Sequence, residues 1–416
     1  MELLRNAVRP YAWGSRTAIA ELLGGPVPAP HPQAELWLGA HPADSSVLLH
    51  ADGGQTVLLE ALRADPGRHL GTHCAARWGS RLPFLLKVLA AEEPLSLQAH
   101  PSAEQAAEGF AREEARGVPR EAPERNYSDP NHKPELICAL TEFHALAGFR
   151  EPLRTVELLA ALDVPPLEPY RAMLAAESNA DGLRMLFTTW ITMPEPAVKA
   201  LLPQILDACV ALLRRRDPRG VPSQGFRPEC RVVLELAEAY PGDVGVLAAL
   251  LLNDIVLAPG EGMYLPAGNL HSYLSGTGVE ISANSDNVLR GGLTAKHMDV
   301  PELLRVLDFS YGELPVQRGE RLGPHETVYR TPAEEFQLTR LDWADGESTP
   351  YVLRSPAPQI LLCTRGSAEL VSPDGARVSL CRGGSVWLAA TDPDVMVCPG
   401  AGPVQLFRAQ PGLVDR

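Results

Sequence analysis

The chain has little of three things that would place it in a special class: paired cysteines, positive charge and long apolar runs. Its seven cysteines are scattered and form no Cys-x-x-Cys pair, which argues against a disulfide framework or a zinc knuckle. The net charge of −14 argues against a general affinity for nucleic acid or anionic membranes. The longest apolar stretch, 244–252, is far too short to span a bilayer, and residues 1–6 do not resemble a secretory signal. We therefore expect a cytoplasmic protein that binds neither nucleic acid nor membranes.

Lysine is also scarce. Only four of the 37 basic residues are lysines: Lys87, Lys133, Lys199 and Lys296. An ammonium group is a compact point charge that a planar guanidinium does not replace. Three of the four lysines lie close to the motifs described below, which indicates positions where arginine does not serve; placement by chance is the alternative.

Length and composition predict a globular protein with two or three domains. The 416 residues exceed what one core usually supports, and 45% of them are hydrophobic. Short apolar runs between Gly- and Pro-rich joints predict β structure in 1–150 and 256–312. Residues 151–255 have helical periodicity with Pro, Asp or Gly stops. Many short strands predict a sandwich or barrel in 313–416, where the absence of histidine after His325 argues against a second metal site.

The run Pro-Leu-Ser-Leu-Gln-Ala-His-Pro at 94–101 is predicted to be one strand with two unlike faces. Because alternate residues of a strand point to opposite sides, its apolar residues face a hydrophobic layer. The polar residues share the other face: Ser96, Gln98 and His100. Gln and His two positions apart offer an oxygen and a nitrogen donor to a metal, although a solvated polar face is the ordinary alternative.

A second polar group stands at the entrance to the apolar run 135–140. His132, Lys133 and Glu135 are crowded together there, and ionisable groups are costly to bury without partners. A simple strand-entry turn is the alternative. If the segment is extended, Lys133 shares a strand face with Glu135. Lys87 interrupts another apolar strand, predicted at 82–89.

A third group follows a Gly- and Pro-rich turn that ends at Gly268. This turn is expected to aim His271 and Tyr273 inward from one strand face. After a loop predicted at 275–278, the next strand has one polar face, which carries Glu280, Ser282 and Asn284. The loop that comes next contains further polar and charged residues: Asn287, Arg290 and Lys296.

The spacing Gly260-x5-Pro266-x-Gly268-x2-His271 fits the second sequence motif of the cupin double-stranded β-helix, whose histidine points into the barrel at a metal. With Leu-Ser-Leu-Gln-Ala-His-Pro, Asn-His-Lys-Pro-Glu-Leu and Arg-Gly-Gly-Leu-Thr-Ala-Lys-His, it makes the chain resemble the type I phosphomannose isomerases. The resemblance extends through Tyr-Ala-Trp-Gly (11–14) and Tyr-Pro-Gly-Asp-Val-Gly (240–245). It implies a mainly β fold with a cupin (jelly-roll) catalytic domain from 1–150 and 256–312. A helical domain (151–255) and a C-terminal cupin-like β domain without metal (313–416) complete the expected fold.

The resemblance implies one zinc ion per chain, with four ligands: Gln98, His100, Glu135 and His271. Two imidazoles and two oxygen donors suit zinc or a similar divalent ion. Because glutamine stands in place of a second carboxylate, the site keeps a net positive charge, which makes the metal a stronger Lewis acid. The implied reaction interconverts mannose 6-phosphate and fructose 6-phosphate by proton transfer through an enediolate.

The resemblance also suggests roles for other residues. Arg290 matches the arginine that the family treats as essential, and we assign it to stabilising the intermediate or orienting the substrate. Lys133 is the candidate for proton transfer, with His132 and Glu280 as alternatives. The phosphate is expected to contact Ser96, Lys87 and Lys296. The rest of the sugar site is expected to include Tyr273, Glu280 and Asn287.

Two other functions are weighed against the isomerase. One is a catalytically silent sugar-phosphate-binding or regulatory module that keeps the cupin pocket; the retained Arg290 and motif lysines argue against it. The other is an iron cupin oxygenase, which usually holds its metal with more histidines and fewer amide donors. The expected partner is a small sugar phosphate, and we expect the chain to be a monomer.

Overall fold

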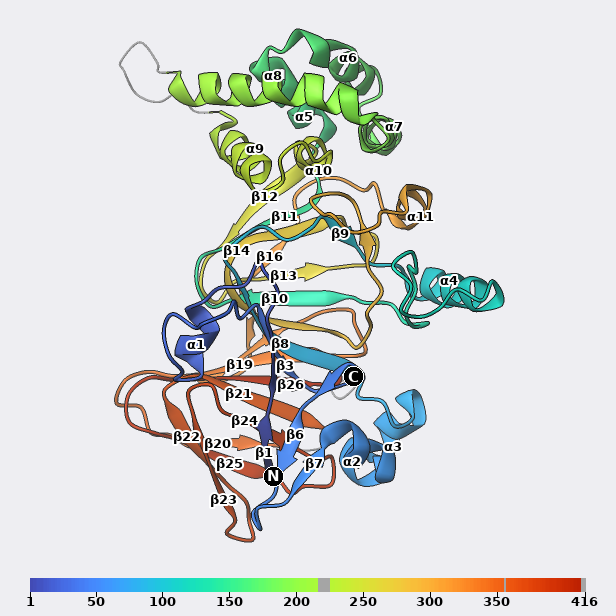
Figure 1. Ribbon diagram of the computed structural model, residues 1–416. Coiled ribbons are helices and arrows are strands. Elements are labelled where there is room, and N and C mark those ends of the chain that lie inside the picture. The colour runs from blue at the N-terminus through green and yellow to red at the C-terminus, as the bar shows by residue number, and fades with distance from the viewer. Residues whose placement is uncertain (216–224, 355–356, 413–416) are drawn as a thin grey trace.

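The structure is a computed structural model that describes residues 1–215, 225–354 and 357–412. Small parts of the expected helical and C-terminal domains therefore lie outside the described residues. Strands make up the lower and middle parts of the molecule in Figure 1, and a group of helices lies at the top. The expected fold class, mainly β with a helical region, is confirmed.

The central sheet carries the residues that were predicted to bind a metal. Its longest strand, β14, pairs with four neighbours: β8, β9, β10 and β11. The strands of this 11-stranded sheet are β2 (Ala7–Arg9), β3 (Glu35–Leu38), β8 (Phe84–Ala91), β9 (Gln98–Ala99), β10 (Glu135–Ala139), β11 (Phe143–Phe149), β12 (Leu252–Leu257), β13 (Gly262–Leu265), β14 (His271–Ala283), β15 (Leu289–Arg290) and β16 (Val316–Gln317).

The strand predicted over 94–101 is mostly wrong, because only Gln98 and Ala99 form a strand. The backbone before them bonds to two different segments rather than to one ladder: the amide of Leu95 donates to the carbonyl of Tyr273, and that of Leu97 to the carbonyl of Gly292. The predicted alternation of burial holds from Leu95 to Ala99 but not at His100, which is buried. Leu95, Leu97 and Ala99 are buried, whereas Ser96 and Gln98 are partly exposed.

The loop predicted at 275–278 is also wrong, since β14 runs through it without a break. Gly276 has a φ of +114°, and a Cβ there would lie 2.5 Å from the carbonyl oxygen of Glu142. Glycine therefore serves close packing and a bend in a continuous strand at this position, not a turn.

A nine-stranded sheet joins the first and last parts of the chain. Its strands in spatial order are β17 (Glu320–Arg321), β18 (Glu326–Tyr329), β19 (Gln337–Trp343), β26 (Val404–Gln410), β21 (Gln359–Arg365), β24 (Ser385–Leu388), β1 (Glu2–Arg5), β6 (Val47–Leu49) and β7 (Gln55–Val57). Three N-terminal strands thus extend a sheet whose other strands come from 313–416. The division of the chain into three domains by residue range stays a prediction, and this sheet crosses its boundaries.

The nine-stranded sheet packs on both faces. Leu361 contributes to a core with Leu370 of a smaller sheet, whereas Ile360 contributes to a core with Leu86 of the central sheet. The smaller sheet has four strands: β20 (Tyr351–Leu353), β25 (Val395–Pro399), β22 (Ser367–Val371) and β23 (Arg377–Cys381). A separate pair is formed by β4 (Ala40–His41) and β5 (Asp44–Ser45). The sandwich predicted for 313–416 is thus present, as two sheets that share one core.

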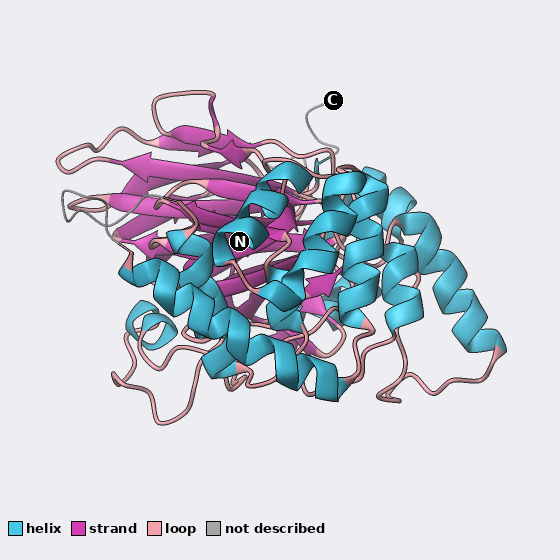
Figure 2. Cartoon of the chain, turned by 90° about the horizontal axis from the view of Figure 1, so that it is seen from above, coloured by secondary structure: helices cyan, strands magenta, loops and turns pink. Residues whose placement is uncertain are grey.

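The predicted helical region is confirmed and covers one end of the central sheet, as Figure 2 shows from above. It comprises α5 (Pro152–Leu162), a 3-10 turn (Pro165–Leu167), α6 (Glu168–Ala176), α7 (Ala180–Ile191), α8 (Glu195–Arg214), α9 (Arg227–Ala239) and α10 (Gly245–Ala249). Leu97 and Ala99 join the core of this layer. Burying the apolar face of β9 here turns Gln98 the other way, towards the central sheet's cavity.

Helix α8 is long and apolar enough, by length and composition, to cross a bilayer. Its residues Leu201, Ile205 and Cys209 pack into the core of the helical layer, which a core helix of a folded domain also does. Four further helices lie around the sheets: α1 (Ala18–Leu22), α2 (Leu58–Ala64), α3 (Pro66–Trp78) and α11 (Val300–Val306). Helix α4 (Ala103–Ala115) begins after a capping box between Ser102 and Gln105.

A buried histidine on α3 makes the stability of the fold depend on pH. His69 accepts a hydrogen bond at Nδ1 from the indole of Trp387 (3.3 Å), and burial lowers its pKa below 6.5. The unfolded chain therefore binds more protons than the folded one as the pH falls below about 6.5, so stability is lost in that direction. We expect His69→Gln, whose side-chain oxygen still accepts from Trp387, to reduce the drop in urea midpoint between pH 7.5 and pH 5.5. An unchanged drop would contradict this role.

Candidate metal centre and active site

Three of the four predicted metal ligands lie together inside the central sheet. His100 follows β9, Glu135 begins β10 and His271 begins β14. Their ligand atoms lie within 4.8 Å of one another, and all three side chains are buried. Oε2 of Glu135 lies 3.2 Å from Nε2 of His100 and 3.5 Å from Nε2 of His271. Two nitrogens and a carboxylate oxygen therefore face one point.

The two imidazoles are oriented from behind by backbone carbonyls. Nδ1 of His100 lies 2.7 Å from the carbonyl oxygen of Asn287, and Nδ1 of His271 lies 3.1 Å from that of Asn269. With the proton on Nδ1, each Nε2 presents a lone pair, as in metal-bound histidines. These two Nε2 atoms and Oε2 of Glu135 are buried without a hydrogen-bond partner in the described part of the chain. Such a cluster of acceptors is costly unless a cation satisfies it, so the donor set fits a divalent metal.

The charges of the centre match what a metal requires. Burial lowers the pKa of His100, so its ring is neutral at neutral pH. Burial acts to raise the pKa of Glu135, but the positive charge of Lys133, 3.0 Å away, opposes it, and the pKa lies well below its usual value. Neutral imidazoles and an ionised carboxylate are the protonation states that bind metals.

Gln98, the fourth predicted ligand, is paired in register with both His271 and Arg290. Its side chain lines the cavity beside the centre. Its role as a ligand stays a prediction.

A cavity of about 480 Å³ opens beside the metal centre. Most of the predicted site residues line it: Lys87, Ser96, Gln98, Lys133, Glu135, Tyr273, Glu280, Arg290 and Lys296. They come from five strands and three loops, and the fold brings them together from positions up to 209 apart only by pairing distant strands. His100 and His271 lie beneath this surface, fully buried.

Lys87 lies in a buried network of charges at one side of the cavity. Its Nζ is 3.0 Å from Oε2 of Glu280 and 3.6 Å from Oε1 of Glu35. Tyr273 donates to the other oxygen of Glu280 (3.0 Å), and the indole of Trp37 donates to Glu35 (2.7 Å). Burial acts to lower the pKa of Lys87, but the two carboxylates outweigh it and raise the pKa, so the ammonium stays charged. A phosphate at Lys87 would have to compete with both carboxylates.

Arg290 and Lys296 differ from Lys87, because neither has an ion-pair partner among the described residues. Burial lowers the pKa of Arg290, and burial together with the charge of Arg290 lowers the pKa of Lys296. Two neighbouring cations without a carboxylate partner in the described part of the chain can attract an anion to the cavity wall.

The segment that carries these cations, β15 and the loop after it, is held by the motif at 240–245. Oδ1 of Asp243 accepts from the amides of Gly245 (2.7 Å) and Leu293 (2.8 Å). Gly292 has a φ of +119°, and a Cβ there would lie 2.5 Å from Cα of Gly245. The glycines therefore allow a close contact that fixes the loop beside β9.

Two residues predicted near the substrate do not line the cavity. The side chain of Asn287 accepts from the amide of Ser128 (2.8 Å) and donates to the carbonyls of Asp129 (2.7 Å) and Asn131 (2.8 Å). It thus holds the segment before Lys133, and its own carbonyl orients His100. His132 points to a second cavity, described below.

Sequence reasoning missed other residues of the cavity, chiefly Glu35, Trp37 and Asp286. Glu35 and Trp37 lie two apart on β3, so alternation placed them on one face, but nothing local indicates that this face meets Lys87. Asp286 lies 3.3 Å from the imidazole of His41.

Comparison with known proteins agrees with the geometry. Residues 1–152 match the family model of the phosphomannose isomerase type I catalytic domain. The chain is 39% identical over 406 residues to mannose-6-phosphate isomerase of Escherichia coli (strain K12), covering 95% of this chain and 97% of the relative. It is 31% identical over 422 residues to mannose-6-phosphate isomerase 1 of Arabidopsis thaliana, covering 98% and 93%. A crystal structure of the Salmonella typhimurium enzyme bound to fructose 6-phosphate and zinc superposes with a TM-score of 0.85 at 36% identity, covering 99% of each chain. The chain belongs to the type I phosphomannose isomerase family.

Proposed function

We propose that this chain is a zinc-dependent aldose–ketose isomerase that interconverts mannose 6-phosphate and fructose 6-phosphate. One observation carries the proposal: the donor atoms of His100, Glu135 and His271 converge beside a cavity whose wall also holds the unpaired cations Arg290 and Lys296. A metal centre next to an anion site suits a phosphorylated sugar.

The two histidines and Glu135 would hold the zinc, with Gln98 as the fourth ligand. When bound, zinc supplies positive charge that stabilises the negative charge developing on the sugar oxygens. The carbonyl contacts behind His100 and His271 keep both rings aimed at the ion without further adjustment.

The phosphate is assigned to Arg290 and Lys296, with Ser96 beside Gln98 as a hydroxyl donor. Arg290 is paired in register with Gln98, so this phosphate site adjoins the metal ligands. Lys87 stays a candidate contact, although its ammonium already faces Glu280 and Glu35. In this arrangement the carbon chain of the sugar phosphate lies between the cations and the metal.

Proton transfer between carbons 1 and 2 needs a group that reaches both carbons. Nζ of Lys133 lines the cavity and lies 3.0 Å from Oε1 of Glu135, which places it next to the centre. Glu280 is the alternative: burial raises its pKa, which makes its carboxyl a better base near neutral pH than an ordinary glutamate. Tyr273 holds that carboxyl in place.

We further propose that the protein acts in the cytoplasm as a monomer without nucleic-acid or membrane partners. The net charge of −14 and the seven free cysteines support this assignment. Sedimentation of the purified chain tests the monomer directly.

Removal of the metal tests the proposed function. Dialysis against a chelator is expected to abolish the interconversion, because the buried acceptors then have no cation, and zinc is expected to restore it. An assay that couples fructose 6-phosphate formation to a dehydrogenase measures the rate, and metal analysis of the same samples measures zinc. A full rate in metal-free protein would overturn the metal's role. Stoichiometric binding of the sugar phosphate without turnover would favour the silent binding module.

A further inference from the structure

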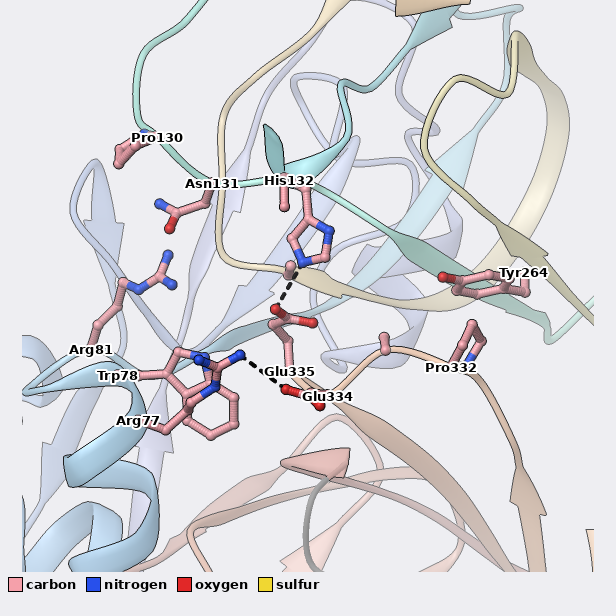
Figure 3. Close-up of a pocket in the computed structure, with 13 residues that line it drawn as sticks. Arg77, Trp78, Arg81, Pro130, Asn131, His132, Tyr264, Pro332, Glu334 and Glu335 are labelled. Carbon is pink, nitrogen blue, oxygen red and sulfur yellow. Dashed lines mark hydrogen bonds and ion pairs between the residues drawn. The ribbon is translucent and has the colours of Figure 1, made fainter. Parts of the chain in front are cut away.

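A second cavity, of about 510 Å³, lies next to the segment that ends in Lys133 (Figure 3). It is lined by residues of α3, the loop after α3, the segment 130–132 and the segment 332–335 of the C-terminal part of the chain. His132 points into this cavity, whereas Lys133 lines the cavity of the metal centre. Two consecutive side chains therefore serve two different cavities.

His132 is held across the second cavity by Glu335. Nε2 of His132 lies 2.8 Å from Oε1 of Glu335, a contact between residues 203 positions apart, drawn as a dashed line in Figure 3. Burial acts to raise the pKa of Glu335, but the hydrogen bond and the charge of His132 outweigh it and lower the pKa. The contact with His132 is made by Oε1, whereas Oε2 of Glu335 is buried without a hydrogen-bond partner in the described part of the chain.

The backbone is held on both sides of His132. Its upstream side is fixed at the carbonyl of Asn131, which accepts from Asn287 (2.8 Å) and Ser285 (3.1 Å). Downstream, Pro134 has a restricted φ, its carbonyl accepts from the amide of Ala283 (3.0 Å), and β10 begins at Glu135. Between these two points the contact with Glu335 holds the side chain of His132 on the side of the second cavity. Because Lys133 precedes a proline, its backbone favours an extended conformation, in which consecutive side chains point to opposite sides, so this contact favours the direction in which Lys133 reaches Glu135.

We propose that Glu335 is a positioning residue, which holds His132 in the second cavity so that Lys133 is directed to Glu135 and the substrate. The C-terminal part of the chain thereby contributes to the active site without touching the substrate. The catalytic consequence rests on the proposed isomerase function, but the effect on Lys133 does not.

Two substitutions separate geometry from charge. Glu335→Asp keeps the charge but shortens the side chain, so the contact with His132 is lost; Glu335→Gln keeps the length and an oxygen that accepts from Nε2. We expect Glu335→Asp to lower kcat about 10–100-fold, as loss of an orienting partner does, with a smaller change in KM, and Glu335→Gln to retain most of kcat. Glu334→Asp is the matched control, because the neighbouring Glu334 pairs with Arg77 at a more exposed position.

Labelling of lysines gives a readout that does not depend on activity. The chain has only four lysines, so trace acetylation followed by mass spectrometry resolves each one. Lys199, an exposed residue paired with Glu195, is the internal reference. In Glu335→Asp we expect the labelling of Lys133 relative to Lys199 to change at least twofold. A twofold change in this ratio corresponds to about 0.4 kcal/mol at 25 °C. In Glu335→Gln and Glu334→Asp we expect the wild-type ratio.

The outcomes are distinct. If the wild type does not isomerise the sugar phosphate, the proposed function fails, and the labelling ratio still tests the position of Lys133. If Glu335→Asp leaves both kcat and the labelling ratio unchanged, or if Glu335→Gln is the more damaging change, the positioning role is overturned. Thermal unfolding of each variant accompanies these measurements, and equal midpoints with unequal kcat support positioning over a general loss of stability.

Discussion

His271→Ala is expected to lose zinc and isomerase activity together. His271 supplies one of the three converging donor atoms, and its ring is fully buried and fixed by the carbonyl of Asn269. Alanine leaves His100 and Glu135 as an incomplete set, so a stable site is no longer formed. The loss should exceed the about 10–100-fold typical when only an orienting partner of a ligand is removed. Metal analysis after dialysis and the coupled assay measure the two effects.

A matched control and added zinc sharpen this test. His144→Ala removes a histidine of β11 that lies on the surface, paired with Glu142, and should leave zinc content and rate unchanged. Because the missing donor is part of the protein, excess zinc should not restore His271→Ala. Activity that survives in His271→Ala, or returns with zinc, would remove His271 from the ligand set.

Lys87→Met is expected to cost the fold about 3–5 kcal/mol, as breaking a buried ion pair does when one charge is left behind. The ammonium of Lys87 lies between the carboxylates of Glu280 and Glu35, and all three groups are buried. Without it two like charges face each other in a poorly solvated place. Urea unfolding at pH 7.5 measures the loss, and turnover should fall as well because all three groups line the active-site cavity.

The pH dependence of the stability loss in Lys87→Met identifies the cause of that loss. The pKa of Glu280 is already raised above 4.5 in the wild type, and losing Lys87 should raise it further. A folded state with a raised carboxyl pKa binds more protons than the unfolded chain, so the penalty should shrink as the pH falls from 7.5 towards 4.5.

Adding Glu280→Gln to Lys87→Met should recover part of the stability, since one of the two facing charges is removed. Lys199→Met is the control: its pair with Glu195 is exposed, and surface pairs contribute about 0–1 kcal/mol. Equal losses for Lys87→Met and Lys199→Met would show that the buried network does not need its cation.

Local sequence patterns were sufficient for the features that repeat at short range. Helical periodicity located the helical layer, and alternation of polar and apolar residues indicated that Ser96 and Gln98 leave the core. The glycine- and proline-rich turn before His271 predicted the strand that begins there. These features are set by backbone geometry over a few residues, so the sequence alone carries them.

Glycine and strand patterns do not predict a structure that depends on a tertiary contact. Gly276, predicted to lie in a loop, lies inside β14, where the absence of a side chain makes room for the backbone of Glu142. The run 94–101 does not form one strand, because its amides bond to two separate segments. In both cases the residue pattern cannot identify which distant segment lies alongside.

The sequence by itself determined the family, the chemical types of the predicted metal ligands and the layer of helices in which the apolar face of β9 is buried. Only the tertiary structure decided which charges meet. Lys87 faces Glu280 across 193 positions through the pairing of β8 with β14, and His132 faces Glu335 across 203 positions through a segment of the C-terminal part of the chain. The physical reason is that strand register and loop docking depend on the packing of whole sheets, which no local period encodes.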